Sequence, residues 1–398
     1  MKQNSSRLGD IFLSIAVCIQ FFLIILQQCM IGILHMDPEN TTIYRVIFSA
    51  IPIIISFYFI FKRDLLFAIT TYVIALLIML LHSIIFPDNE PYIWTQGVRF
   101  LLPICIPTML AMRVVEKYEN FNKMLIIISW CTIVLLFIYI ICFLGGIVSI
   151  ENYNMSFGYG LLLPTLVLYR QQTLFSKIIF LFASLSILFL GSRGPLLVIF
   201  AYVMYDIFCN NKRYIPIVLG MSILFVLSIP FLIDYLDGLG ISSRTLNMFV
   251  EGTIDQDSGR GFLTSITVEA ILEHPFFGLG IFSDRVLLEG IQPYCHNLFL
   301  ELFVNWGIPL SIVFLFLLLR RIIKIYLLIK YKQQRMLLVL FFVSSFIPLM
   351  LSNSYLIDPV IWSFFGLLLF YNRNISKMYR NFYHNKSVCK KVDNYIEK

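Results

Sequence analysis

Long apolar segments separated by short polar ones follow one another along most of the chain. A helix needs about 20 apolar residues to cross a membrane, so the pattern predicts an all-α polytopic membrane protein with about twelve transmembrane helices. The shortest segments, between 156 and 209, could also be tilted or re-entrant helices. The predicted helices lie at 11–34, 44–61, 65–86, 95–114, 124–148, 156–169, 177–191, 195–209, 214–233, 298–319, 336–351 and 359–371.

Basic residues are distributed unevenly between the segments that join these helices. Lysine and arginine accumulate on the cytoplasmic side of membrane proteins. With the N-terminus in the cytoplasm, all but six of the 30 basic residues lie in cytoplasmic segments. This pattern predicts a multi-pass protein of a bacterial inner membrane, with an even number of helices and both termini in the cytoplasm. The six exceptions, all on the outer side, are Arg45, Arg99, Arg193, Arg244, Arg260 and Arg285.

Four regions follow from this map. Residues 1–233 contain the first nine helices, and 298–371 contain the last three. Between them, 234–297 form one large extracytoplasmic loop, and 372–398 form a basic cytoplasmic tail. We expect the chemistry of the protein to be in or beside the large loop.

The composition agrees with a membrane protein and excludes several other classes. Only 13% of the residues are charged, whereas soluble proteins average about 25%. The net charge of +7 comes from residues that anchor the inner face, so no nucleic-acid partner is predicted. Most of the eight cysteines lie in apolar segments, which indicates reduced thiols rather than a disulfide framework.

The outer arginines are candidate anion-binding residues. Arginine presents a rigid set of donors that matches phosphate oxygens. Arg193 lies in a short Gly-Ser-Arg-Gly-Pro connection, 191–195, where a head group could approach closely; the alternative is an arginine that snorkels to the interface. Arg99 lies inside the fourth segment, where a charge needs a partner, and Glu301 is the candidate.

The large loop contains a predicted amphipathic helix near residues 262–273. Ser258 can cap its beginning, and Arg260 would lie at its positive N-terminal end, where an anion is favoured. The stretch 274–280, His-Pro-Phe-Phe-Gly-Leu-Gly, then breaks the helix; on its own, this whole region could simply be an ordered loop. Leu263, Ile266 and Ala270 would line one face of the predicted helix.

His296 directly precedes the tenth predicted helix and is a candidate general base, since histidine titrates near neutral pH. A lone histidine is more often structural, so this residue alone decides little. No spacing of histidines and cysteines indicates a metal site. Asp255-Gln256-Asp257 is a DxD triplet of the kind that holds a divalent metal in some glycosyltransferases, but three-residue motifs often arise by chance.

Taken together, these motifs resemble those of the O-antigen ligase and O-antigen polymerase superfamily. The resemblance covers about residues 185–320 and depends on the order and spacing of its motifs. The first half of the chain resembles the family only in hydropathy. The matching residues are Gly-Ser-Arg-Gly at 191–194, Gly-Arg-Gly at 259–261, the 274–280 stretch, and His296 and Asn297 followed by Gly307.

The resemblance implies a metal-independent glycosyltransferase related to the GT-C class, without a cofactor. Its donor would be a glycan linked to undecaprenyl diphosphate. By this analogy, Arg193 and Arg260 bind the diphosphate, and His296 takes the proton from the acceptor hydroxyl. Arg99, Arg285, Asn297 and Glu301 are expected to support the site. A chain-length regulator and a flippase are possible partners.

Other functions stay open at this point. The Gly-Ser-Arg-Gly-Pro turn favours an O-antigen or capsular polysaccharide polymerase over a ligase that transfers finished glycans to a lipid A core. A teichoic-acid or protein-directed relative fits the same motifs. A lipid-linked glycan transporter is a different class, which often shows inverted repeats; no repeat is visible here. If the protein had only a structural role in the membrane, nothing would explain why every basic residue on the predicted outer side is an arginine.

Overall fold

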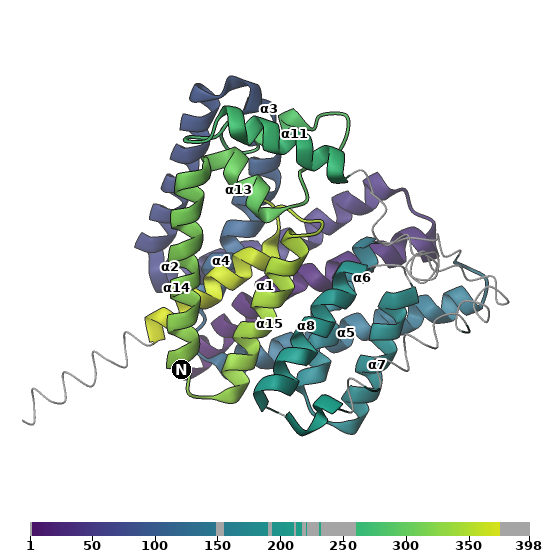
Figure 1. The fold of residues 1–398 in the computed structure, drawn as a ribbon. Coiled ribbons are helices and arrows are strands. Elements are labelled where there is room, and N and C mark those ends of the chain that lie inside the picture. The colour runs from purple at the N-terminus through teal and green to yellow at the C-terminus, as the bar shows by residue number, and fades with distance from the viewer. Residues whose placement is uncertain are drawn as a thin grey trace, which may run out of the picture.

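The computed structural model describes residues 2–148, 155–189, 193–210, 212–216, 220, 231 and 260–374, and this part of the chain is helical throughout, with no strand (Figure 1). A last helix covers 359–374. The other main helices are α1 (Lys2–Leu34), α2 (Pro38–Ile85), α3 (Glu90–Gln96), α4 (Ile106–Val114), α5 (Tyr118–Leu144), α6 (Met155–Arg170), α7 (Leu174–Phe189), α8 (Arg193–Asn210), α11 (Arg260–Glu273), α12 (Ser283–Leu287), α13 (Leu298–Trp306), α14 (Ile308–Leu328) and α15 (Lys332–Leu349).

Several helices have the length and composition of membrane spans. Within the described residues, four stretches qualify: Ser6–Leu34, Pro38–Ile85, Pro87–Val114 and Tyr118–Leu144. In the third, a π-helical segment (Gly97–Cys105) joins α3 to α4. The predicted helix at 214–233 lies almost entirely outside the described residues, as do most of the large loop and the basic tail. The total of twelve helices therefore stays a prediction.

The helix α2 consists of two helices separated by a sharp turn at Asp64. This residue has a non-helical conformation, with φ −158° and ψ 56°. The rings of Phe57 and Tyr72 lie 6.1 Å apart, although a straight helix would separate these positions by about 22 Å. The predicted segments 44–61 and 65–86 thus lie on the two sides of a bend. The bend is fixed by an ion pair of 2.9 Å between Asp64 and Arg113.

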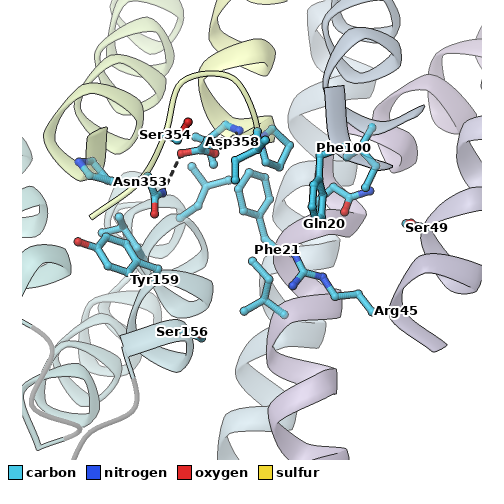
Figure 2. Close-up of a pocket in the computed structure, with 18 of the residues that line it drawn as sticks. Gln20, Phe21, Arg45, Ser49, Phe100, Ser156, Tyr159, Asn353, Ser354 and Asp358 are labelled. Carbon is cyan, nitrogen blue, oxygen red and sulfur yellow. Dashed lines mark hydrogen bonds between the residues drawn. The ribbon is translucent and has the colours of Figure 1, made fainter. Parts of the chain in front are cut away.

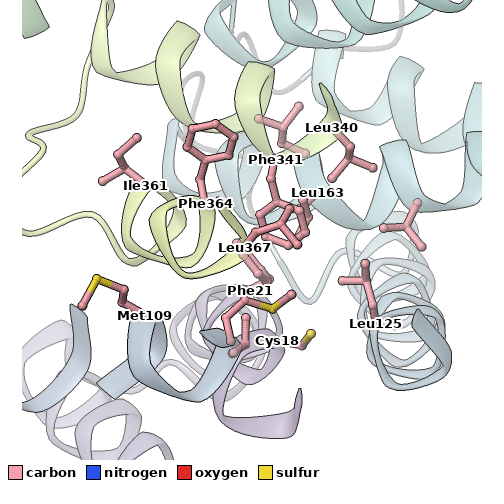
Figure 3. Close-up of a cluster of buried hydrophobic side chains, with 14 of the residues drawn as sticks. Cys18, Phe21, Met109, Leu125, Leu163, Leu340, Phe341, Ile361, Phe364 and Leu367 are labelled. Atoms are coloured by element: carbon pink, nitrogen blue, oxygen red, sulfur yellow. The ribbon is translucent and has the colours of Figure 1, made fainter. Parts of the chain in front are cut away.

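The hydrophobic core forms where the N-terminal helices meet the C-terminal ones (Figure 3). Cys18 of α1 and Met109 of α4 belong to one buried cluster with Phe341 of α15 and Phe364 of the last helix. Gly366 allows the last helix to approach α4 closely, because a Cβ atom there would lie 2.4 Å from the carbonyl oxygen of Met109. The last helix is therefore an integral part of the core.

A buried carboxylate organises the end of the molecule that carries the N-terminus. Asp10 accepts hydrogen bonds from Arg63 at 2.6 Å and from the backbone N–H groups of Glu116 and Lys117 at 3.0 Å each. Asn120 donates a further bond at 3.0 Å. A buried carboxylate needs such compensation. The segments joined here are among those that the sequence predicts to be cytoplasmic.

The prediction of one uninterrupted helix over 298–319 is wrong. The chain breaks at Gly307, whose φ is +74°, and divides into α13 and α14. Pro309 is the second residue of α14. It suits the first turn of this helix, because proline lacks the N–H that would be unsatisfied there. The continuous hydropathy of this stretch concealed the break.

The helix that the sequence predicts near residues 262–273 is confirmed, although Phe262 and Leu272 are exposed on its outer face. The helix α11 lies across one end of the bundle beside α13 and near α3, away from the end that carries the N-terminus (Figure 1). Leu263 and Ala270 are buried on its inner face, and Ile266 is partly buried there, as the periodicity predicts. Ser258, the predicted cap, lies outside the described residues.

Candidate functional site

A cavity of about 340 Å³ opens between helices from both halves of the chain (Figure 2). Gln20 of α1 and Arg45 of α2 lie on one side of it, and Tyr159 of α6 lies on the other. The loop between α15 and the last helix supplies Asn353 and Asp358. Apolar side chains line much of the remaining wall. The cavity thus offers polar groups in an otherwise apolar space, which is typical of ligand sites.

Gly194, the last residue of the Gly-Ser-Arg-Gly motif, lies beside this cavity. A Cβ atom at Gly194 would lie 2.0 Å from the hydroxyl oxygen of Tyr159, so only glycine allows this approach. The same hydroxyl accepts a hydrogen bond of 2.6 Å from Ser352. Arg193 begins α8, but its side chain is outside the part of the chain that the structure describes. The backbone of Arg193 lies next to Gly194. This residue, which is predicted to bind the diphosphate, is therefore close to the cavity wall.

His296 is connected to the cavity through Tyr294. Tyr294 lines the cavity, donates a hydrogen bond of 2.6 Å to the carbonyl oxygen of Ser352, and has its ring centroid 4.6 Å from that of His296. Burial raises the pKa of Tyr294 to about 12, so it stays protonated and keeps donating. Nε2 of His296 lies 3.5 Å from Oε1 of Gln292.

The backbone of His296 is in the left-handed region, with φ +54°. Such a conformation is uncommon for a residue with a side chain, and strain of this kind often accompanies functional sites. The next residue, Asn297, caps α13: its Oδ1 accepts from the N–H groups of Phe299 at 3.0 Å and Leu300 at 3.4 Å. The supporting role predicted for Asn297 is thus a helix cap that fixes the position of His296.

The first turn of α11 lies next to the His296 loop. Leu263 packs with Leu288 and Cys295 in a small buried cluster. Arg260, one turn earlier, begins α11, and its side chain lies outside the described residues. Of the three positions predicted from the resemblance, Arg193 and His296 thus adjoin residues that line the cavity, and Arg260 begins the helix that packs against the residue before His296. Arg244 and the Asp255-Gln256-Asp257 triplet lie outside the described residues.

A buried ion cluster lies behind the His296 loop. The guanidinium group of Arg285, 2% exposed, donates to Asp284 at 2.6 Å and to Glu301 at 3.0 Å. A further guanidinium N–H donates to the hydroxyl of Ser354, and that hydroxyl donates to Glu301. The second oxygen of Glu301 accepts from the backbone N–H of Tyr355 at 3.2 Å. The cluster therefore joins α12 and α13 to the loop that lines the cavity.

The predicted pairing of Glu301 with Arg99 is wrong. Glu301 pairs with Arg285, which comes from the large loop and not from the fourth segment. Arg99 is exposed on the π-helical segment, and its guanidinium group lies 5.3 Å from the centre of the Phe100 ring. The side chain therefore points away from the buried cluster that contains Glu301.

The 274–280 stretch has a structural explanation. Gly278 (φ +67°) and Gly307 (φ +74°) face each other so closely that a Cβ atom at Gly278 would lie 2.6 Å from the nitrogen of Gly307. The backbone N–H groups of Leu279 and Gly280 donate to the carbonyl oxygens of Val304 at 2.7 Å and Asn305 at 3.1 Å. These glycines thus dock the end of α11 onto the junction of α13 and α14.

Cys295 and metal ligation offer no alternative chemistry within the described residues. Burial raises the pKa of the Cys295 thiol well above its usual range, so it is a neutral, unreactive group. No three histidine, cysteine, aspartate or glutamate side chains in this part of the chain are grouped so that they could hold a metal ion.

Asp358 gives a first testable prediction. Its pKa is raised to about 6 by burial, although Asn353 and the backbone N–H of Val360 donate to it. Between about pH 4 and 6 the folded state holds a proton that the unfolded state releases, so stability falls as pH rises through this window. Asp358→Asn keeps the bond from Val360 but cannot ionise. We expect this variant to exceed wild type in stability by up to about 3 kcal/mol above pH 6, and to equal it near pH 4.

Thermal unfolding of the purified proteins between pH 4 and 8 measures this difference. If the unfolding temperatures of the variant and wild type differed by the same amount at all pH values, the result would contradict the raised pKa of Asp358.

Several residues of the site escaped sequence analysis, among them Tyr159, Tyr294, Ser354 and Asp358. Two of them had a weak signal. Asp358 precedes Pro359 at the start of an apolar run, as a helix cap does. Tyr294 lies two residues before His296. Tyr159 and Ser354 lie in apolar or neutral surroundings, and only the packing of distant helices brings them to the cavity.

Residues 178–315 match the sequence model of the O-antigen ligase family. This stretch begins in α7, contains Gly194, α11 and His296, and ends in α14. A search of curated proteins and a search of solved structures each found no match. The matched stretch supports a place for the chain in the O-antigen ligase and O-antigen polymerase superfamily, and four helices in the described part of the chain are long and apolar enough to cross a membrane.

Proposed function

We propose that this protein is an O-antigen or capsular polysaccharide polymerase. It transfers a glycan from undecaprenyl diphosphate onto a hydroxyl group of a second lipid-linked repeat unit. The observation that supports this most is that Gly194 contacts Tyr159 and His296 contacts Tyr294, because both tyrosines line the same cavity. The first turn of α11 packs against Cys295, next to His296.

The reaction needs a base, a leaving group and alignment. His296 takes the proton of the acceptor hydroxyl, and the oxygen attacks the anomeric carbon as the bond to the diphosphate breaks. The diphosphate leaves with the bonding electron pair, and the configuration at the carbon is inverted. Arg193, Arg260 and the N-terminus of α11 stabilise the charge on the diphosphate. The glycan is already activated in the donor, so neither a nucleotide nor a metal is required.

The orientation of the chain follows from the same proposal. The end that carries Asp10, Arg63 and Arg113 faces the cytoplasm, and α11 lies on the outer surface of the inner membrane. Both termini are cytoplasmic. A flippase would then deliver the lipid-linked repeat units to the outer side, and a chain-length regulator would control how often transfer repeats.

A reconstitution experiment tests this function. Purified protein in liposomes receives a lipid-diphosphate-linked repeat unit in the presence of EDTA and without nucleotide. We expect a ladder of glycolipid products at regular intervals on a gel. Arg193→Ala and Arg260→Ala should abolish the ladder, and Arg213→Ala, an exposed cation at the other end of the molecule, should leave it unchanged.

Other outcomes of this experiment identify other functions. Transfer that occurs only after a lipid A core acceptor is added would identify a ligase, which the description of the matched family also allows. Movement of the lipid-linked unit across the bilayer without any transfer would contradict the enzyme and identify a transporter.

A further inference from the structure

Two buried polar groups on the cavity wall have no hydrogen-bond partner within the described residues. Gln20 of α1 is 2% exposed, and its amide nitrogen makes no hydrogen bond. Ser344 of α15 is 3% exposed, and its hydroxyl oxygen is also unsatisfied. Both residues line the 340 Å³ cavity. Buried polar groups are nearly always paired, and unpaired ones in a cavity often mark the place of a ligand.

Arg45 adds a positive charge to the same cavity. It lies in the first half of α2, which has the apolar character of a membrane span, and it lines the cavity (Figure 2). Its guanidinium group donates to the neutral amide oxygen of Gln27 at 3.3 Å and forms no ion pair in the described part of the chain. A charge at such a position is expensive unless a partner of opposite charge is present.

The side chain of Gln27 holds Arg45 in place. The amide nitrogen of Gln27 donates to Thr42 at 3.1 Å while its oxygen accepts from Arg45. Gln27 therefore orients the guanidinium group without neutralising it. Asp358 lines the same cavity, but within the described residues no carboxylate forms an ion pair with the arginine.

The chemistry of these three groups defines the ligand. An amide N–H, a hydroxyl and a guanidinium group are donors, so the ligand must carry several acceptor oxygens and negative charge. Phosphate oxygens match arginine best. The apolar lining of the cavity includes Phe21, Ile24, Phe100 and Ile104, which suit a hydrocarbon chain. The ligand is thus an amphipathic molecule with a phosphate group.

We infer that Arg45, Gln20 and Ser344 bind the diphosphate of a polyprenyl-linked substrate, with the first isoprene units against the apolar wall. This inference rests on the proposed function, which requires such a substrate at the outer side of the membrane. It adds binding residues on α1, α2 and α15 to the arginines on α8 and α11 that are proposed to bind the same diphosphate. All three residues lie outside the stretch that matches the family.

Binding of farnesyl diphosphate to the purified protein in detergent tests the inference. We expect Arg45→Ala to weaken binding by roughly 10- to 100-fold, as loss of a charged donor to phosphate does. Gln20→Leu should weaken it less, and Arg45→Lys should restore part of the affinity. Lys62→Ala is the matched control, since Lys62 is an exposed cation at the other end of the same half of α2, and its affinity should equal that of wild type.

The same titration distinguishes the two sources of a lipid phosphate. Phosphatidylglycerol should compete poorly, because it carries one phosphodiester charge and a bulkier apolar part. Competition equal to that of farnesyl diphosphate would overturn the inference in favour of a phospholipid site. Unchanged affinity of a folded Arg45→Ala protein would overturn it as well.

Failure of the inference and failure of the proposed function give different results. If Arg45→Ala transfers glycan with unchanged KM for the lipid-linked substrate, the inference fails and the enzyme stands. If wild type binds farnesyl diphosphate in an Arg45-dependent manner but transfers no glycan, the binding site stands and the proposed function fails.

Discussion

Replacement of His296 by alanine is expected to reduce glycan transfer by about 10²- to 10⁴-fold, the usual contribution of a general base. The acceptor hydroxyl is a weak nucleophile until its proton is removed, and in the proposed reaction the imidazole of His296, which lies beside Tyr294, accepts that proton. Initial rates of ladder formation in liposomes measure the effect.

The backbone of His296 requires a second variant. Alanine removes the imidazole but must also adopt φ +54°, which it does reluctantly. Asparagine tolerates this region and can still form hydrogen bonds, but it cannot accept a proton near neutral pH. His296→Asn should therefore be as inactive as His296→Ala while unfolding at the wild-type temperature. Substantial activity of His296→Asn would show that the histidine positions the loop and does not act as the base.

Loss of the Arg285 guanidinium group is expected to destabilise the protein by about 3–5 kcal/mol, as removal of one member of a buried ion pair does. In Arg285→Ala, Asp284 and Glu301 would remain buried without their cation. The detergent-purified variant should unfold at a much lower temperature or be lost as aggregate. Arg213→Ala, which removes an exposed arginine, is the control and should unfold as wild type does.

A double variant separates charge from shape in this cluster. Arg285→Ala with Glu301→Gln leaves only one buried carboxylate and should recover part of the lost stability. The unfolding temperatures of the two single variants, the double variant and wild type form a thermodynamic cycle. Strictly additive effects would contradict direct coupling between Arg285 and Glu301.

The positions of the helices could be predicted from hydropathy because a membrane span needs a minimum apolar length. Interruptions within these helices could not be predicted from hydropathy. Gly307 breaks a stretch of continuous hydropathy, and its role became visible only through its contact with Gly278. The bend at Asp64 was signalled better, since the charged run of Lys62, Arg63 and Asp64 separates the two segments.

The candidate site was only partly predictable for a similar reason. His296 and the motifs around Arg193 and Arg260 are recognisable because their order along the chain is distinctive. The pairing of Arg285 with Glu301 is not, because nothing in the sequence says which of several outer arginines points inward. Gln20 and Ser344 are single polar residues in apolar helices, and only the assembled cavity gives them a common surface.

The ion cluster around Arg285 also limits how the enzyme can be divided. Ser354 and Tyr355 supply its bonds from beyond residue 315, where the family match ends. Two residues from before residue 178 also hold this region: His82 accepts from the backbone N–H of Ile281 at 3.0 Å, and Asn89 donates to the carbonyl oxygen of Leu279 at 2.7 Å. A fragment cut to residues 178–315 would lose both sets of contacts and expose Glu301 without its neighbours. The segment that matches the family is therefore not an independent module, and its transfer into another membrane protein would have to include both flanking regions.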